Sequence, residues 1–185
     1  MNSTIVRGGT ALLDVYAILT KLGIKEGDVV GDLGCGGGGH FVIASAKMAG
    51  VRGTIYAVDV QKSVLEYIES RAKIDQIETI KTVWANLEKF GSVKIPDNEC
   101  DIAILANVLF QNKDFSTILR EAARIIKPGG RLAVIDWKKI AAPFGPPVEL
   151  RVGEDVVKHY GQEAGLKFVD EFDAGQYHYV LIFMK

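Results

Sequence analysis

The sequence has little of what several protein classes require. Its only two cysteines, Cys35 and Cys100, are too few for a disulfide framework and lack metal-site spacing. No apolar run approaches the ~18 residues that span a membrane, and Asp14 interrupts the apolar stretch near the N-terminus, so we expect no signal peptide. Basic residues are not in surplus: 22 Lys and Arg against 23 Asp and Glu argue against a nucleic-acid partner. These absences predict a cytoplasmic protein with reduced thiols.

Short apolar segments alternate along the chain with amphipathic ones, a pattern typical of an α/β protein. The predicted helices are Thr10–Leu22, His40–Met48, Ser63–Ala72, Asp114–Lys127 and Glu154–Ala164. The predicted strands are Asp28–Leu33, Gly53–Val60, Ile77–Trp84, Cys100–Ala106, Arg131–Asp136, Lys167–Phe172 and Tyr177–Phe183. The connection between the last two strands is too short for a parallel return. We therefore expect a mostly parallel seven-stranded sheet, helices on both faces, and an antiparallel C-terminal strand.

A glycine run lies between the first predicted strand and the helix that follows it. Every position of Gly34–Gly39 except Cys35 is glycine, which is more than a tight turn needs. Glycine lets the backbone turn sharply and lets a ligand approach main-chain N–H groups. Asp59 ends the next strand, where a carboxylate accepts hydrogen bonds from ribose hydroxyls. The two features together indicate an adenosine-containing ligand.

The same glycines also fit the dinucleotide pattern G-x-G-x-x-G, so the run alone does not identify the ligand. Asp32 stands two positions before the first glycine, where it would repel a pyrophosphate but could hold a cationic ligand such as a sulfonium with an α-amino group. In addition, no Tyr has a Lys four positions later, as short-chain dehydrogenases require. A nicotinamide-dependent oxidoreductase is therefore the second hypothesis.

Five segments, in order over nearly the whole chain, carry a family resemblance: Val30–Gly36, Tyr56–Asp59, Pro96–Asp101, Ala106–Leu109 and Glu121–Leu132. The sequence resembles the class I S-adenosylmethionine-dependent methyltransferases, particularly the ubiquinone/menaquinone C-methylase-like (methyltransferase type 11) subgroup. The resemblance implies a Rossmann-like fold, S-adenosyl-L-methionine as cofactor, S-adenosyl-L-homocysteine as product, and methyl transfer by in-line displacement to an unidentified, small-molecule acceptor. We expect one domain, 1–185, with an N-terminal helical lid segment, 1–24, and a Rossmann-like core, 25–185.

The resemblance also implies which residues bind the cofactor. Asp32 and the glycine loop would hold the methionine portion, Asp59 the ribose, and Val60 one side of the adenine. Asn86 stands where family members usually have Asp to contact the adenine amine, and simple turn chemistry is the alternative for Asn86 and Asn107. The full predicted set is Asp32, Gly34, Cys35, Gly36, Gly38, Asp59, Val60, Asn86, Leu87 and Asn107.

No catalytic residue is assigned, because the cofactor brings the reactive group and a base is optional. His178 is the best base candidate if the acceptor needs one, while His40 is expected beside the cofactor loop and His159 on the surface. Phe110 is expected to wall the acceptor pocket. No carboxylates or histidines have metal-ligand spacing, so we expect no metal.

The loop after the fifth strand is the least specific part. Lys138 and Lys139 could steer an anionic acceptor and Arg151 could clamp it, although a solvated loop is the favoured interpretation. The proline-rich stretch Ala141–Val148 and the first helix, with Tyr16, are the material available to cover the acceptor. A non-catalytic S-adenosylmethionine-binding module and a protein or RNA acceptor are further alternatives.

Overall fold

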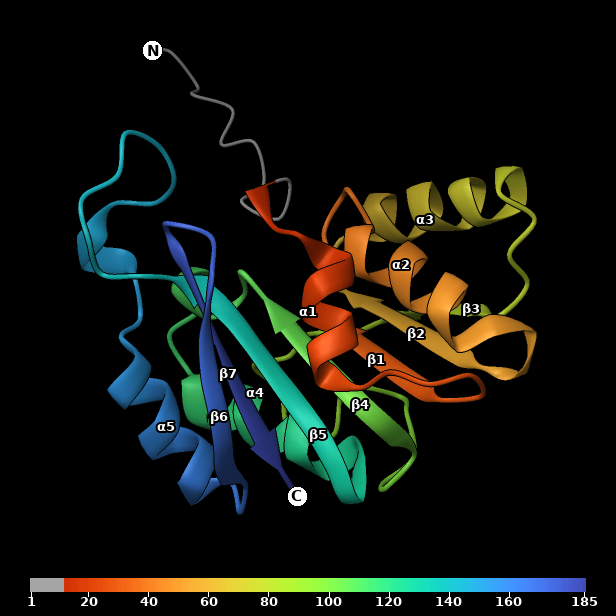
Figure 1. Cartoon of the computed structure of the whole chain (residues 1–185). Helices are drawn as coiled ribbons and strands as arrows, with labels where there is room; N and C mark the ends of the chain where they lie inside the picture. The colour runs from red at the N-terminus through yellow and green to blue at the C-terminus, as the bar shows by residue number, and fades with distance from the viewer. Residues whose placement is uncertain (1–11) are drawn as a thin grey trace.

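A single seven-stranded sheet organises residues 12–185, which the computed structural model describes (Figure 1). Its strand order is β3-β2-β1-β4-β5-β7-β6. Its strands are β1 (Val29–Leu33), β2 (Thr54–Asp59), β3 (Ile80–Trp84), β4 (Cys100–Ala106), β5 (Ile126–Trp137), β6 (Lys167–Ala174) and β7 (His178–Met184). Neighbouring strands are parallel except at β7, which runs antiparallel to both β5 and β6. The predicted fold class is confirmed.

Helices cover both faces of the sheet, as predicted. They are α1 (Val15–Leu22), α2 (His40–Ala49), α3 (Lys62–Ile74), α4 (Phe115–Ile125) and α5 (Glu154–Glu163). Figure 1 shows α1, α2 and α3 on one face and α4 and α5 on the other, and each face has its own apolar core. Successive strand residues point to opposite faces, so Val134 packs with the α4–α5 core and Ile135 with the α1–α3 core.

The junction between α4 and β5 differs from the prediction. The helix ends at Ile125, before Lys127, and the strand begins at Ile126, whose ψ of 138° is already extended. Cys100 pairs with Ile126 and Ile102 with Arg131, so the Pro-Gly-Gly segment forms an irregularity inside the strand. Pro-Gly-Gly is a helix stop in the sequence, but here the backbone continues to pair across the sheet.

Two further boundaries were predicted too long. β3 begins at Ile80 rather than Ile77, because the Ile77 N–H returns to the carbonyl of Ala72 (2.8 Å) and closes the end of α3. α1 begins at Val15 because Asp14 caps it by accepting the Ala17 N–H at 3.0 Å. The predicted helix residues Thr10 and Ala11 lie outside the described residues. The other predicted boundaries agree to within two residues.

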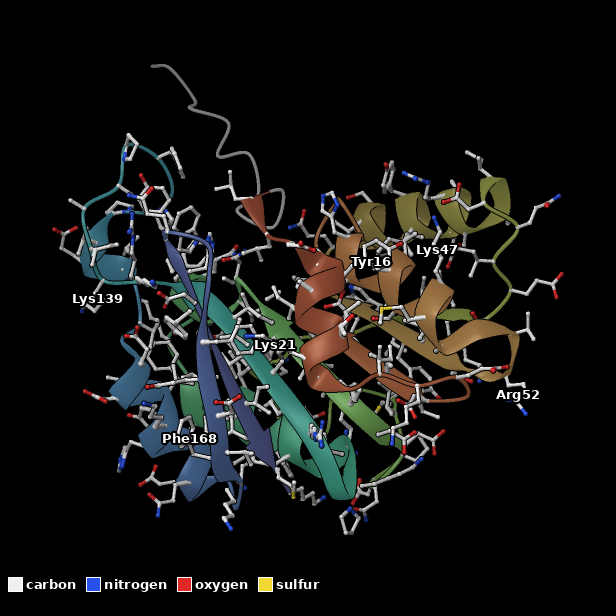
Figure 2. All side chains as sticks on the ribbon, viewed as in Figure 1. Tyr16, Lys21, Lys47, Arg52, Lys139 and Phe168 are labelled. Atoms are coloured by element: carbon white, nitrogen blue, oxygen red, sulfur yellow. The ribbon has the colours of Figure 1, made fainter. Side chains whose placement is uncertain are left out.

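The strand order creates a switch point between β1 and β4. The chain leaves β1 towards β2 on one side and returns to β4 on the other, so the loops at their carboxyl ends diverge, and open α/β sheets bind ligands at such a point. α1 is docked on the sheet beside this edge: Leu19 and Leu22 are fully buried, and the Lys21 ammonium lies 3.9 Å from the ring centre of Phe172 on β6 (Figure 2). Among the residues described, no helix combines the length and apolarity needed to cross a membrane.

Candidate functional site

The glycine loop bends from the end of β1 onto the end of β2. Gly34, Gly36 and Gly39 have φ values of 79°, 64° and 53°, the left-handed region that favours glycine. The N–H groups of Gly34 and Cys35 donate to the carbonyl of Val58 at 2.8 and 3.0 Å. The loop is therefore a fixed structure beside β2 before any ligand is considered.

Asp59 joins this loop to the turn that follows β2. One carboxylate oxygen accepts the N–H of Gly36 at 3.0 Å and the other accepts the N–H of Gln61 at 2.9 Å. The side chain is only 7% exposed. Each oxygen retains acceptor capacity, so Asp59 can hold the two loops and still receive a hydroxyl donor.

The loop is closed on one side and open on the other. A Cβ atom on Gly34 would lie 2.7 Å from the side chain of Val108, and one on Gly38 would lie 2.5 Å from the His40 ring. By contrast, a Cβ on Gly36 or Gly37 would have no neighbour within 4 Å. The middle of the loop therefore presents bare backbone to open space, the cradle a close-lying ligand requires.

Asp32, the last but one residue of β1, is a buried carboxylate with little compensation. Its side chain is 1% exposed, and among the described residues neither oxygen has a hydrogen-bond partner within 3.5 Å. Burial, and then the charge of Asp59, raise the pKa of Asp32 from 3.8 to about 7, although the backbone N–H of Val42 at the start of α2 opposes this. An unpaired buried charge is costly, so a cation beside Asp32 would be strongly favoured.

The loops after β2 and β3 complete the same edge. Val60 is 55% exposed, and its carbonyl accepts the indole N–H of Trp84 at 2.8 Å. Leu87 is buried, with a methyl carbon 3.8 Å from the Cβ position of Gly34, so the loops after β1 and β3 meet. Asn86 is exposed, and its side-chain oxygen accepts the N–H of Glu88 at 2.9 Å, which is the turn chemistry weighed as its alternative.

The loop after β4 closes the site on the other side. Asn107 is buried with a left-handed φ of 59°; its N–H donates to the carbonyl of Ile135 at 2.8 Å, and its own carbonyl accepts the Gln111 amide at 2.6 Å. Cys35, also predicted at the site, is half-buried, and burial followed by the Asp32 and Asp59 charges raises the pKa of its thiol. The thiol is therefore protonated and a poor nucleophile.

Asp136 is a residue of this edge to which the sequence analysis gave no role. It is fully buried near the end of β5, and it accepts the N–H groups of Leu109 (3.0 Å), Phe110 (3.4 Å) and Trp137 (2.8 Å). Burial raises its pKa to about 7 although these N–H groups lower it. Asp136 thus fixes the turn after β4, including Phe110. An acid at a strand end, the signal that identified Asp59, would also have identified it.

Arg151 is neither the predicted anion clamp nor part of a solvated loop. It is 3% exposed, and its guanidinium donates to the carbonyls of Pro146 (2.9 Å), Lys138 (3.0 Å) and Ile140 (2.7 Å). It also lies 5.1 Å from the Trp137 ring centre. Its donors are therefore used within the loop that follows β5, and the side chain pins that loop instead of binding an acceptor.

The lysines of this loop differ from each other. Lys138 is mostly buried and pairs with Asp173 at 2.7 Å, whereas Lys139 is exposed (Figure 2). The predicted irregular stretch Ala141–Val148 is confirmed, apart from a single 3-10 turn that begins at Val148.

The three histidines lie in different environments. His178 is 1% exposed, its ring centre is 4.1 Å from that of Trp137, and burial followed by the Arg151 and Lys138 cations lowers its pKa to about 4. A pKa this low makes the buried imidazole a weak proton acceptor, so the structure gives no support to its use as a base. His40 is exposed beside the glycine loop, and His159 is on the surface 3.5 Å from Glu163, as predicted.

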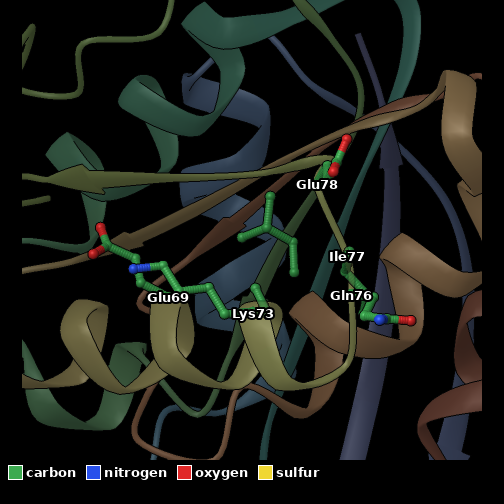
Figure 3. Close-up of a pocket in the computed structure, with 7 residues that line it drawn as sticks. Glu69, Lys73, Gln76, Ile77 and Glu78 are labelled. Atoms are coloured by element: carbon green, nitrogen blue, oxygen red, sulfur yellow. The ribbon is translucent and has the colours of Figure 1, made fainter.

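A groove of about 680 Å³ lies away from this edge (Figure 3). It is formed by the end of α3 and the start of β3, and it is lined by Glu69, Ala72, Lys73, Gln76, Ile77, Glu78 and Ile80. A smaller groove of about 480 Å³ lies at the glycine loop, between α1, α2 and α3, where it is bordered by Tyr16, Gly38 and His40. Within residues 12–185, no group of three His, Cys, Asp or Glu side chains is arranged to hold a metal ion.

Comparison with known proteins identifies the family. Residues 31–134, more than half of the chain, match the family described as a methyltransferase domain. The chain belongs to this methyltransferase family. The match begins in β1, just before the glycine loop, and ends in β5, so it spans the loops after β1, β2, β3 and β4. The resemblance read from the five sequence segments is confirmed.

Individual relatives agree with this assignment. The ubiquinone/menaquinone biosynthesis C-methyltransferase UbiE of Chromobacterium violaceum is 30% identical over 142 residues, 77% of this chain and 56% of that protein. The demethylmenaquinone methyltransferase of Geobacillus sp. is 27% identical over 118 residues, 64% of this chain and 49% of its own length. The chain thus spans about half the length of the curated relatives it matches.

A solved structure matches almost end to end. A SAM-dependent methyltransferase from Aquifex aeolicus superposes with a TM-score of 0.86 at 29% identity, covering 95% of this chain and 92% of that one. The Rossmann-like methyltransferase fold is therefore shown, and the nicotinamide hypothesis has no support from these relatives.

Proposed function

We propose that this chain is an S-adenosyl-L-methionine-dependent methyltransferase acting on a small-molecule acceptor. The observation that carries the proposal is the buried carboxylate of Asp32 behind the open glycine loop. A ligand with a cationic amino group would supply the missing charge partner of Asp32. A pyrophosphate would instead add further negative charge beside the carboxylates of Asp32 and Asp59. Membership of the methyltransferase family supports the same cofactor.

The proposed cofactor site extends over four loops, those that follow β1, β2, β3 and β4. Asp32 would neutralise the amino group, the bare backbone at Gly36 would lie against the methionine portion, and Asp59 would accept the ribose hydroxyls. Around these we propose Gly34, Cys35, Gly38, Val60, Asn86, Leu87 and Asn107. The open space at Gly36 and the free acceptor capacity of Asp59 support this placement.

The protein's share of the chemistry is placement. When bound, the cofactor supplies a methyl group activated by its attachment to a sulfonium. The chain must hold an acceptor atom in line with that methyl and exclude water. Asp136 fixes the turn that carries Phe110, and Arg151 fixes the loop after β5, so both walls of the acceptor side are held by buried hydrogen bonds. No described side chain is needed as a base if the acceptor is presented unprotonated.

A small-molecule acceptor is supported by the names of the relatives, which refer to demethylmenaquinone and to ubiquinone/menaquinone biosynthesis. We further propose that residues 12–24, the described part of the predicted lid segment 1–24, cover one side of the site of the 25–185 core. The groove between Tyr16 on α1 and His40 beside the glycine loop supports this second proposal. A cytoplasmic location is proposed from the two unpaired thiols, Cys35 and Cys100.

The test is calorimetric titration with S-adenosylhomocysteine and, separately, with NADH. We expect micromolar binding of S-adenosylhomocysteine alone. Binding of NADH alone, or of neither, would overturn the proposal. Incubation with methyl-labelled S-adenosylmethionine and a panel of quinols then distinguishes an enzyme from a non-catalytic binding module, which would bind the cofactor without transferring label to any acceptor.

A further inference from the structure

One buried ion pair on α4 holds the loop that follows β3. We define the adenine-side loop as residues 86–98, since it begins with the proposed adenine contacts. Glu121 on α4 is fully buried; one of its oxygens accepts the N–H of Gly91 at 2.9 Å and the other accepts the N–H of Val93 at 3.0 Å. A carboxylate out of reach of solvent therefore fixes two backbone groups of the loop.

Arg124, one helical turn later, holds the same loop from its carbonyl side. It donates twice to the Glu121 carboxylate, at 3.0 and 2.9 Å. Its remaining N–H groups donate to the carbonyls of Val93 (2.9 Å) and Ile95 (3.0 Å) and to the side chain of Asp97 (2.5 Å). Val93 thus has both its N–H and its carbonyl held by the ion pair, and the loop has little freedom to shift along α4.

The held part of the loop is connected directly to Asn86. The Asn86 carbonyl accepts the Lys89 N–H at 3.0 Å and the Ser92 hydroxyl at 2.5 Å. Ser92 lies between Gly91 and Val93, the two residues that Glu121 anchors. The position of Asn86 therefore depends on α4, although α4 lies on the sheet face opposite α2 and α3 (Figure 1).

A buried ion pair usually contributes no more to the free energy of unfolding than apolar packing does. Desolvating two charges offsets much of their attraction, and well-packed apolar residues often serve stability equally well. What charged groups add is directed hydrogen bonds, and this pair directs five of them at one loop. We propose that Glu121 and Arg124 are positioning residues that set where Asn86 and Leu87 meet the adenine ring; this inference rests on the proposed function.

The proposal predicts an effect on base recognition. The Asn86 side-chain oxygen accepts one backbone N–H and keeps a second lone pair for an amine donor. Adenine offers such a donor at its 6-position, whereas hypoxanthine has an oxygen there. The protein should therefore bind S-adenosylhomocysteine more tightly than S-inosylhomocysteine, and the ratio of the two dissociation constants should report the placement of Asn86.

The experiment measures both dissociation constants by calorimetry for the wild type and for three variants. Glu121→Gln removes the acceptor that serves Gly91 or Val93, and Arg124→Lys keeps the charge but loses most of the directed bonds. Asp101→Asn is the matched control. Asp101 also pairs with a basic residue, Lys127 (2.8 Å), and accepts a backbone N–H, that of Val29 (2.8 Å). It lies at the start of β4, however, and makes neither contact with the adenine-side loop. All are compared at a temperature where unfolding curves show full folding.

We expect Glu121→Gln and Arg124→Lys to weaken S-adenosylhomocysteine binding about tenfold and to bring the base ratio close to one, an effect of the size of one hydrogen bond. Asp101→Asn should keep the wild-type ratio even if its stability falls. An unchanged ratio in both α4 variants, or an equal fall in Asp101→Asn, would overturn the inference. Failure of the wild type to bind S-adenosylhomocysteine would instead overturn the proposed function, so the two failures are distinguishable.

Discussion

The two buried carboxylates of the proposed site, Asp32 and Asp136, differ in their hydrogen-bond partners. On the proposed cofactor side, Asp32 is buried near the end of β1 with no hydrogen-bond partner within 3.5 Å of either oxygen among the described residues, and the Val42 N–H only partly opposes its raised pKa. On the proposed acceptor side, Asp136 is buried near the end of β5 with three backbone N–H donors, and burial raises the pKa of each carboxyl to about 7. Equal burial and equal pKa therefore do not distinguish a binding group from a structural one; the supply of partners does.

Arg151 extends this contrast to a cation. Its guanidinium is buried like Asp32, but its donors are spent on loop carbonyls. We propose that a buried charge with its own partners holds the fold together, whereas Asp32, which has few, serves a ligand. Each of the following variants tests this difference between the buried charges.

Arg151→Met should have the largest effect on stability. It leaves the carbonyls of Pro146, Lys138 and Ile140 without this donor and removes a buried cation that packs on Trp137, so we expect the free energy of unfolding to fall by about 3 kcal/mol. Urea unfolding measures this, and the folded variant should still bind S-adenosylhomocysteine within about twofold of the wild type. Arg52→Met, at an exposed pair with Glu26, is the control and should change stability by less than about 0.5 kcal/mol. Normal stability in Arg151→Met would mean that its bonds do not hold the loop.

Asp32→Asn should have the opposite signature. Removing a buried charge that has no partner should leave the unliganded protein as stable as the wild type or more stable. Binding of S-adenosylhomocysteine should weaken by about 1.5–3 kcal/mol, because the charge-assisted contact to the amino group is lost. Calorimetry and thermal unfolding of the same preparation test both. Unchanged affinity would remove Asp32 from the site.

Asp136→Asn should resemble Arg151→Met on a smaller scale. An amide offers one acceptor oxygen where the carboxylate offers two, so one of the N–H groups of Leu109, Phe110 and Trp137 is left unpaired. We expect a loss of about 1–2 kcal/mol in the free energy of unfolding, with cofactor affinity unchanged. If this variant instead lost affinity and kept its stability, the distinction between the two carboxylates would be wrong.

Asp32 should also impose a pH dependence on the free energy of unfolding. The pKa of Asp32 is raised from 3.8 to about 7 on folding, so the folded chain binds more protons than the unfolded chain between these values. Its contribution to the free energy of unfolding is therefore full below pH 4 and is lost as pH rises towards 7. Urea unfolding across this window should show a shallower decline in Asp32→Asn than in the wild type. Identical slopes would mean that Asp32 does not titrate as proposed.

The sequence predicted those features whose signal is local. The apolar run Cys100–Ala106 became β4 without a change of boundary, and the spacing of Asp32 before Gly34 singled it out as a partner for a cation. The prediction for Arg151 was wrong because its partners are backbone carbonyls. Every residue has such a carbonyl, so the sequence gives no signal of which ones Arg151 contacts. The start of β5 was missed for a similar reason, since Ile126 already pairs with Cys100 of β4, and the helix therefore ends before Pro128 is reached.

Proton release on ligand binding tests the central claim most directly. Wild-type protein and Asp32→Asn would be titrated with S-adenosylhomocysteine at pH 7 in two buffers of different ionisation enthalpy. If the ligand's amino group stabilises the ionised form of Asp32, the wild type should release about half a proton per ligand bound at this pH. Asp32→Asn should release none. Equal binding enthalpies in both buffers for the wild type would contradict the account.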